Sequence, residues 1–207
     1  MTDGAPSAPG PGAPLSILVV SHVGSVWGAQ QRLLDLAPLL ADEGIRLTMA
    51  SPEGELSERW MAAGLPHLTL NLPAHGGVRR DGGGRPGPVA LALELATVLR
   101  SAGVIARRAR PFDLVQSHSL FAHLETSITG ILARRPVVLD LHDIVSDGVG
   151  KRVLGAAARL ATMVLANSAA TASTVPGAQR TTTIVHPGVD ITRFHPGPVG
   201  SHIRAEL

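Results

Sequence analysis

Short, nearly continuous apolar runs alternate along residues 15–187 with longer segments in which apolar positions recur every three or four residues. The short runs, among them ILVV, VVLDL and MVLA, are typical of strands that are covered on both faces of a sheet. They predict seven strands, at residues 16–21, 45–50, 67–70, 113–117, 137–142, 162–167 and 182–186.

The longer segments predict helices at residues 29–43, 55–63, 89–109, 120–133, 150–160 and 169–175. One face of the first helix carries four apolar side chains, Leu33, Leu36, Ala37 and Leu40. Gly44 provides its C-terminal stop, and Pro38 should kink it. Gly103 marks a point at which the third helix could break.

Strands and helices that alternate at these spacings indicate right-handed parallel crossovers. We therefore predict an α/β fold with a doubly wound, mostly parallel, Rossmann-like sheet of about seven strands. We expect a single domain at residues 15–187, after a disordered Gly/Pro/Ala tail at 1–14. The Gly-rich segment 75–88 should form a mobile loop, and 188–207 a linker to a further domain.

Composition narrows the class of protein. Apolar residues make up 44% of the 207 positions, which is enough to form a hydrophobic core. Charged residues make up only 16%, and the net charge is +2, which excludes a disordered polyampholyte and a strongly basic nucleic-acid-binding protein. The pI of about 10.3 is high because there is no Cys or Tyr and Lys151 is the single lysine. The absence of Cys excludes disulfides and Cys-ligated metals, and the small number of aromatic residues argues against base stacking.

We find no signal for export or membrane insertion in the sequence. Residues 1–14 lack the basic start and apolar centre of a signal peptide, and the window 153–166 is too short for a span and contains Arg159. We expect a soluble, cytoplasmic protein. Four arginines lie on or directly after the predicted helix 89–109: Arg100, Arg107, Arg108 and Arg110. They could form a solvated face of the helix, or they could contact an acceptor phosphate or an anionic membrane.

The loop after the first predicted strand is a candidate phosphate site. Gly24 and Gly28 would let the backbone approach a ligand closely, and the helix that opens at Ala29 would offer free N–H groups and a positive dipole end. The loop matches neither G-x-G-x-x-G nor a P-loop. A plain strand-to-helix turn is the alternative.

Two further strands end in polar residues on the edge where ligands bind in such sheets. These residues are Ser117, His118 and Ser119 after one strand, and His142 and Asp143 after the other. A His there can hydrogen-bond a sugar hydroxyl, act as acid or base, or simply cap a loop. We take Ser117, His118 and Asp143, with Trp27, as candidates for sugar or acceptor binding. His118 and His123 lack a third ligand at metal spacing, so we predict no metal.

The segment 184–196, IVHPGVDITRFHP, resembles the N-G-V-D-x-x-R/K-F-x-P signature of the retaining glycosyltransferases of family four, which have the GT-B fold. Other stretches follow in the family's order. SHVGSVWGAQQRLLDLAPLLADEGIRLTMASP resembles the first strand, Gly-rich loop, helix and second strand, and three later strands are resembled by FDLVQSHS, VVLDLHD and LANSAAT. The resemblance covers about residues 15–200.

The resemblance implies the N-terminal, acceptor-side half of a GT-B enzyme. Such an enzyme transfers a hexose-type sugar from a nucleotide-sugar donor to a sugar, lipid-linked or small-molecule acceptor, with retention and without a required metal. By the same resemblance, Gly28 and Ala29 would meet the donor diphosphate, and His142 would contact the donor sugar as the catalytic residue. Peripheral membrane contact is compatible with it, and nucleic acid is not an expected partner.

Some positions depart from the family pattern. Trp27 stands before Gly28 where two consecutive Gly are usual, Gln30 stands where Glu is common, and Pro187 replaces Asn. The family's diphosphate-binding Arg/Lys pair and E-x7-E carboxylates belong to a C-terminal domain, which we expect in cis or as a separate chain. A non-catalytic acceptor-binding subunit of a split enzyme, or an unrelated Rossmann-type nucleotide-binding module, are the alternatives.

Overall fold

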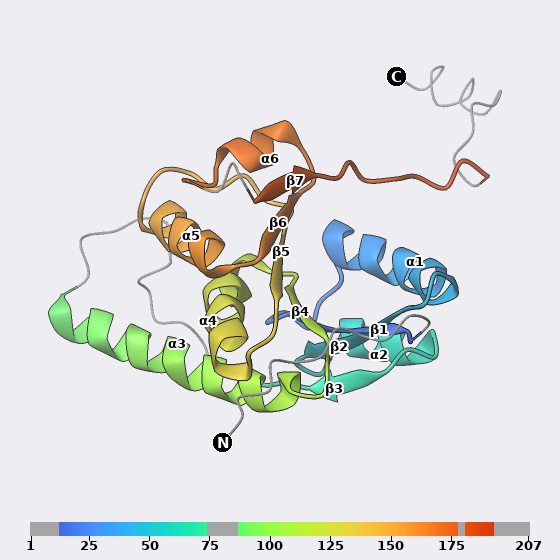
Figure 1. Ribbon diagram of the computed structural model, residues 1–207, viewed down its shortest axis with the longest axis horizontal. Coiled ribbons are helices and arrows are strands. Elements are labelled where there is room, and N and C mark those ends of the chain that lie inside the picture. Colours follow the sequence, from blue (N-terminus) through green and yellow to red (C-terminus); the bar gives the residue numbers. More distant parts are fainter. Residues whose placement is uncertain (1–12, 74–86, 178–180, 193–207) are drawn as a thin grey trace, which may run out of the picture.

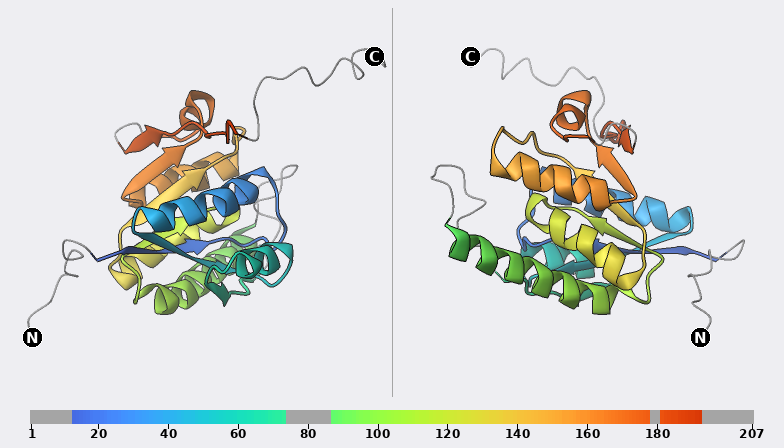
Figure 2. Two further views of the ribbon diagram at one scale, coloured as in Figure 1. Left: turned by 90° about the vertical axis from the view of Figure 1, so that its right-hand side faces the viewer. Right: turned by 60° about the vertical axis from the view of Figure 1, so that its left-hand side comes forward.

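The computed structural model describes residues 13–73, 87–177 and 181–192. Most of the tail predicted at 1–14, of the loop predicted at 75–88 and of the linker predicted at 188–207 lies outside the described residues. The described part of the chain forms a sheet with helices on both faces (Figures 1 and 2).

The sheet has seven parallel strands in the order β3-β2-β1-β4-β5-β6-β7. Their bounds are β1 Leu15–Val20, β2 Ile45–Ser51, β3 His67–Thr69, β4 Leu114–Ser117, β5 Val137–Leu141, β6 Met163–Ala166 and β7 Thr182–Ile184. Each predicted strand is confirmed to within two residues. The order reverses between β1 and β4, and ligands bind doubly wound sheets at such a reversal.

The helices also follow the prediction closely. They are α1 Gly28–Asp42, α2 Glu55–Ala62, α3 Pro88–Ala109, α4 His123–Ala133, α5 Val149–Leu160 and α6 Ala169–Ser173, with a short 3-10 turn, η2, at Leu120–Ala122. The helix predicted at 120–133 is therefore two elements. Helix α3 continues through Gly103, so the break considered there is wrong, and α1 continues through Pro38.

Alternating side chains of β1 divide the core into two layers. Ile17 and Val19 pack with Trp60 and Leu33 beneath α1 and α2. Leu18 and Val20 pack on the other face, with a cluster drawn from α3, α5 and the neighbouring strands that includes Ile105, Val115, Leu139 and Leu154. This burial on both faces explains why the strands read as continuous apolar runs.

Helix α3 is long and apolar enough, by length and composition alone, to cross a membrane, with a mean hydropathy of 1.7. The most apolar window considered from sequence, residues 153–166, lies mostly in α5 and was judged too short for a span. One third of the apolar window in α3 is buried, because Val98, Ala102 and Ile105 pack into the core. Helix α3 thus belongs to the fold, while its first turns expose Val89 and Leu93.

Candidate functional site

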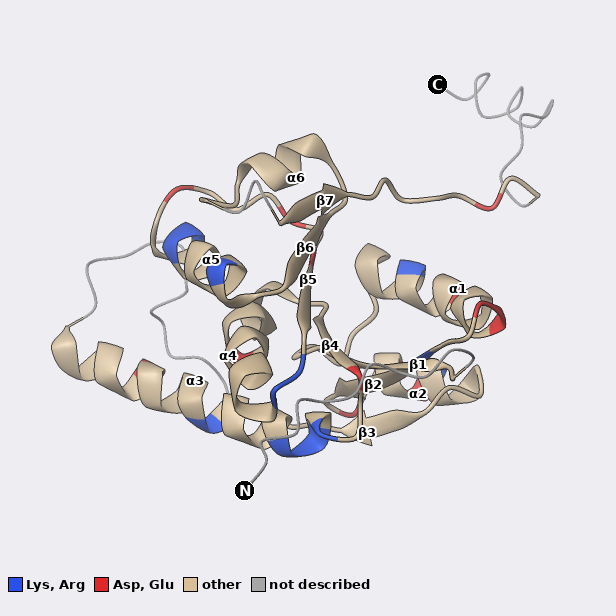
Figure 3. Cartoon of the chain, viewed as in Figure 1, with Lys and Arg blue, Asp and Glu red and all other residues tan. Residues whose placement is uncertain are grey.

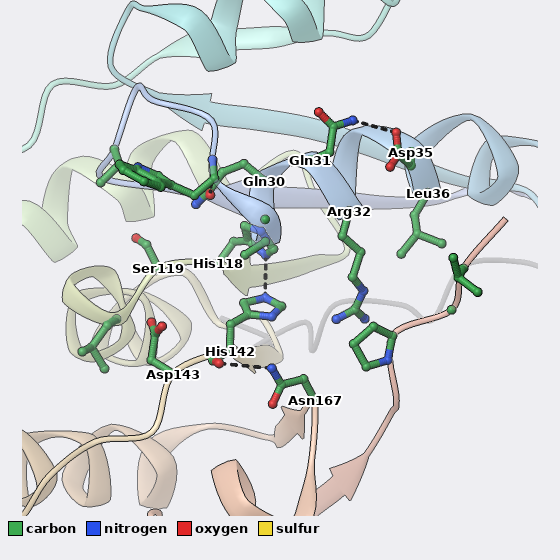
Figure 4. Close-up of a pocket in the computed structure, with 18 of the residues that line it drawn as sticks. Gln30, Gln31, Arg32, Asp35, Leu36, His118, Ser119, His142, Asp143 and Asn167 are labelled. Carbon is green, nitrogen blue, oxygen red and sulfur yellow. Dashed lines mark hydrogen bonds between the residues drawn. The ribbon is translucent and has the colours of Figure 1, made fainter. Parts of the chain in front are cut away.

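A pocket of about 1320 Å³ opens at the carboxyl edge of the sheet, where the strand order reverses (Figure 4). One wall is the loop after β1 together with α1. The residues that follow β4, β5 and β6 form the floor, and residues 187–191 form the wall opposite α1. The segment predicted as a linker therefore begins as part of the pocket.

The first turn of α1 faces this pocket with Gly28 and Ala29. The Gln30 side chain caps the helix, because its Oε1 accepts a hydrogen bond from the Trp27 N–H at 3.2 Å. A Cβ added to Gly28 would meet no atom within 4 Å, so the space above the helix N-terminus is open. Unpaired N–H groups and the helix dipole make this turn suitable for an anion.

Gly24 has a different role from the one the sequence suggested. A Cβ at Gly24 would lie 2.9 Å from the carbonyl oxygen of Glu53, and the Gly24 carbonyl accepts a hydrogen bond from the Leu56 N–H at 2.8 Å. Gly24 therefore lets the β1–α1 loop pack against the loop before α2. The expectation that it serves close approach to a ligand is replaced by this structural role.

A carboxylate and two imidazoles converge beneath the pocket. Asp140 Oδ2 lies 3.0 Å from His118 Nδ1 and 3.1 Å from His142 Nε2, and the two ring nitrogens are 3.4 Å apart. Gln116 Nε2 donates to the same oxygen at 3.1 Å. His118 and His142 were predicted from sequence, whereas Asp140 was not, because it stands inside an apolar strand with no motif around it.

Burial and hydrogen bonding act in opposite directions on Asp140. Burial raises the pKa of its carboxyl group, but hydrogen bonds from His118 and His142 outweigh burial and hold that pKa below its usual value. Asp140 is 7% exposed and His118 only 2%. The carboxylate is therefore ionised at neutral pH, and its charge is stabilised by hydrogen-bond donors of the protein rather than by water.

The same three residues could hold a cation, because His118 Nδ1, Asp140 Oδ2 and His142 Nε2 all lie within 4.8 Å of one another. No carboxylate or further His lies at metal spacing near His118 in the sequence, but the structure brings Asp140 and His142 to it. Without a cation, the two ring nitrogens already donate hydrogen bonds to the Asp140 oxygen. That no metal is needed stays a prediction.

Ser117 is turned away from the pocket. Its hydroxyl lies 2.7 Å from His123 Nδ1, and both residues are buried in the interior beside α4. Burial, opposed by the nearby Asp140 charge, lowers the pKa of His123 to about 3. Ser117 and His123 therefore support the floor of the site, and Ser117, which the sequence suggested as a binding residue, is not among the residues that line the pocket.

We expect His123 to make folding acid-sensitive. Its pKa is about 3 in the folded chain and near 6.5 when unfolded, so its contribution is complete above pH 6.5 and is lost as the pH falls towards 3. Urea unfolding at pH 7, 6 and 5 should show a free energy that falls less steeply in His123→Gln than in the wild type. The difference should approach ~1.4 kcal/mol per pH unit below pH 6.5. Equal slopes would show that His123 is protonated when folded.

His22 and Asn167 also line the pocket, and the sequence singled out neither of them as a candidate binding residue. His22 Nδ1 lies 2.6 Å from Ser119 Oγ, and the His22 ring packs edge-on against Phe121 at a centroid distance of 5.0 Å. Asn167, at the end of β6, donates to the His142 carbonyl oxygen at 3.1 Å and fixes that turn (Figure 4). The sequence offered one signal for them: His22 directly follows one predicted strand, and Asn167 is the last residue of another.

The charged residues of the pocket come from its rim. Arg32 projects from α1 towards the wall at 187–191, and no side chain in the described part of the chain pairs with it (Figure 4). Trp27 and Asp143 also line the pocket and are exposed. The predicted Arg group lies elsewhere, at the end of α3 that leads to the amino end of β4, and its exposed members support the solvated face (Figure 3).

Comparisons with known proteins identify the family of the chain. The sequence profile of Glycosyltransferase Family 4 matches residues 26–193, which is well over half of the chain. No match to a curated protein sequence is found.

Solved structures share the fold. Anabaena Alr3699/HepE in complex with UDP and glucose is similar with a TM-score of 0.67 and 23% identity, over 93% of this chain and 50% of that chain. A glycosyltransferase from Rickettsia africae is similar with a TM-score of 0.64 and 15% identity, over 93% and 48%. Sucrose-phosphate synthase from Thermosynechococcus elongatus gives 0.55 and 14%, over 93% and 53%. The chain spans about half the length of these proteins, and it belongs to glycosyltransferase family 4.

Proposed function

We propose that this chain is the acceptor-side half of a retaining glycosyltransferase, which moves a hexose-type sugar from a nucleotide-sugar donor to a sugar, lipid-linked or small-molecule acceptor. One observation carries the proposal: the open N-terminus of α1 and His142 line a single pocket at the strand-order reversal. The anion site and the hydroxyl-binding imidazole thus face the same space. Family membership excludes an unrelated Rossmann-type nucleotide-binding module.

The chemistry requires stabilisation of charge on the departing diphosphate. The α1 N–H groups at Gly28 and Ala29, together with the Arg32 guanidinium, supply preorganised positive potential, so we propose that no metal is required. The bond between the sugar carbon and the phosphate oxygen breaks as the acceptor oxygen bonds to the same face. The departing phosphate takes the acceptor's proton. His142 contributes a hydrogen bond to the sugar.

The remaining part of the site is proposed to come from a C-terminal GT-B domain, in cis or as a separate chain. This is supported by the coverage of only 50% of Anabaena Alr3699/HepE, whose structures contain UDP, UDP-glucose, or UDP and glucose. A cytoplasmic location, with peripheral membrane contact through the Arg residues of α3, stays a prediction.

Reconstitution tests the proposal. The pure chain should bind UDP-glucose weakly and transfer no sugar, because half of the diphosphate site is missing. Adding the C-terminal half of Anabaena Alr3699/HepE as a second chain should give transfer from UDP-glucose to acceptor oligosaccharides, unchanged by EDTA, with an α-linked product. Transfer by the chain alone would contradict the half-site proposal. Acceptor binding with no transfer in any reconstituted pair would favour a non-catalytic acceptor-binding subunit.

Arg32 provides a second test of the anion site. Arg32→Gln should weaken binding of UDP to the chain by roughly tenfold to a hundredfold, since a hydrogen bond to a charged group contributes roughly 1.5–3 kcal/mol. Calorimetric titration of UDP and of uridine would measure it, and only UDP binding should change. Arg46→Gln, on the exposed side of β2, is the matched control. An equal loss of UDP and uridine binding would show that Arg32 does not contact phosphate.

A further inference from the structure

Asp140 Oδ2 is the meeting point of three donors. His118 Nδ1, His142 Nε2 and Gln116 Nε2 lie 3.0, 3.1 and 3.1 Å from it. An ionised carboxylate has no proton to donate, so each ring nitrogen that faces it must carry the hydrogen. His118 is then protonated on Nδ1, and His142 on Nε2.

The second nitrogen of His118 indicates its charge. His118 Nε2 is enclosed and has no hydrogen-bond partner within the described ranges. A doubly protonated ring would bury an N–H⁺ group without an acceptor, which costs more than an unpaired lone pair. His118 is therefore neutral, and the charge of Asp140 is directed to the hydrogen atoms of both rings.

His142 is the ring that reaches the ligand. Its side chain is 12% exposed and lines the pocket, whereas the His118 side chain is 1% exposed. The two rings meet edge to face, with centroids 4.7 Å apart and an interplanar angle of 69°, so His118 packs against His142 and limits its rotation. With Nε2 occupied by Asp140, the other nitrogen, Nδ1, is left for the pocket.

We propose that Asp140 is a positioning residue which fixes His142 as the Nε2–H tautomer, so that His142 Nδ1 accepts a hydrogen bond from a hydroxyl group of the bound sugar. The inference rests on the proposed function and names the ligand chemistry of one part of its pocket. A bare ring nitrogen attracts a hydroxyl and repels an ionised phosphate oxygen, which carries no proton to donate. The pocket is thus divided: the N-terminus of α1 takes the anion, and the floor takes the hydroxyl.

Tautomers can be read directly from imidazole ¹⁵N spectra of the 207-residue chain at pH 8, with signals assigned by His118→Asn and His142→Asn. The wild type should show His118 protonated on Nδ1 and His142 protonated on Nε2. Asp140→Asn should mix the tautomers of both rings, because the amide can donate as well as accept. Asp42→Asn removes an exposed charge at the end of α1, outside the residues that line the pocket, and it should leave both signals unchanged.

Two spectroscopic results would contradict the positioning role of Asp140. A His118 ring protonated on Nε2, or an Asp140→Asn spectrum equal to the wild type in a variant that still unfolds cooperatively, would overturn the positioning role. The reconstituted transfer assay is a separate readout. Correct tautomers without transfer would leave this inference standing and remove the proposed function.

A titration tests the ligand class. Glucose should shift the His142 Nδ1 signal of the wild type and not that of Asp140→Asn, whereas inorganic phosphate should shift the amide signals of Gly28 and Ala29 and leave His142 Nδ1 in place. A phosphate response at His142 Nδ1, or no glucose response there, would overturn the assignment of a hydroxyl acceptor.

Discussion

Gly28→Val is expected to abolish sugar transfer in the reconstituted enzyme while the chain stays folded. A Cβ at Gly28 meets no atom within 4 Å, so the change should alter the free energy of unfolding by about 1 kcal/mol or less. Two added methyl groups would instead occupy the space above the first N–H groups of α1, where the diphosphate is proposed to bind. UDP binding should fall below detection by calorimetry, and transfer by more than about a hundredfold.

Two other glycines serve as controls. Gly103→Val makes the same change on a helix far from the pocket, with no atom within 4 Å of the new Cβ, and transfer should be normal. Gly24→Val should lower the melting temperature, because its Cβ would lie 2.9 Å from the Glu53 carbonyl oxygen. If Gly28→Val melts far below the wild type, Gly28 is needed for the turn and its assignment to the diphosphate loses support.

The sequence predicted the fold well because the sheet is buried on both faces. Runs such as residues 137–141 contain few polar residues. Glycines such as Gly44, which has a φ of 77°, mark the ends of helices. Where the prediction failed, the local pattern was ambiguous. The segment 120–133 has one continuous apolar pattern, yet η2 ends at Ala122 and α4 begins at His123.

The site was predicted less completely, since its residues are joined by the sheet rather than by sequence. Asp140 comes 22 positions after His118, and only the pairing of β4 with β5 brings the two together. Arg32 lies in a helix where an arginine is expected on the solvent face, and nothing in sequence shows that this face lines a pocket. Ser117 shows a related difficulty. Consecutive residues of an extended segment point to opposite sides, so Ser117 contacts His123 while His118, directly after β4, lines the pocket.

In the proposed mechanism, the position and orientation of the His142 ring matter most. Its Nε2 is held by Asp140 and its backbone carbonyl oxygen by Asn167, so both the ring and the turn are fixed before a ligand arrives. A preorganised hydrogen bond near a centre where charge develops contributes more in the transition state than in the bound ground state. Removing the ring should therefore lower kcat more than it raises KM.

His142→Ala is thus expected to reduce kcat in the reconstituted enzyme by roughly a hundredfold or more. Stability should fall by only about 1 kcal/mol, because one hydrogen bond to Asp140 is lost while His118 and Gln116 still donate to that carboxylate. His186→Ala, which truncates an exposed His beyond β7, should leave kcat unchanged. A near wild-type kcat for His142→Ala would show that the ring only completes the buried cluster around Asp140, and the hydrogen bond to the sugar would have to come from another residue of the pocket.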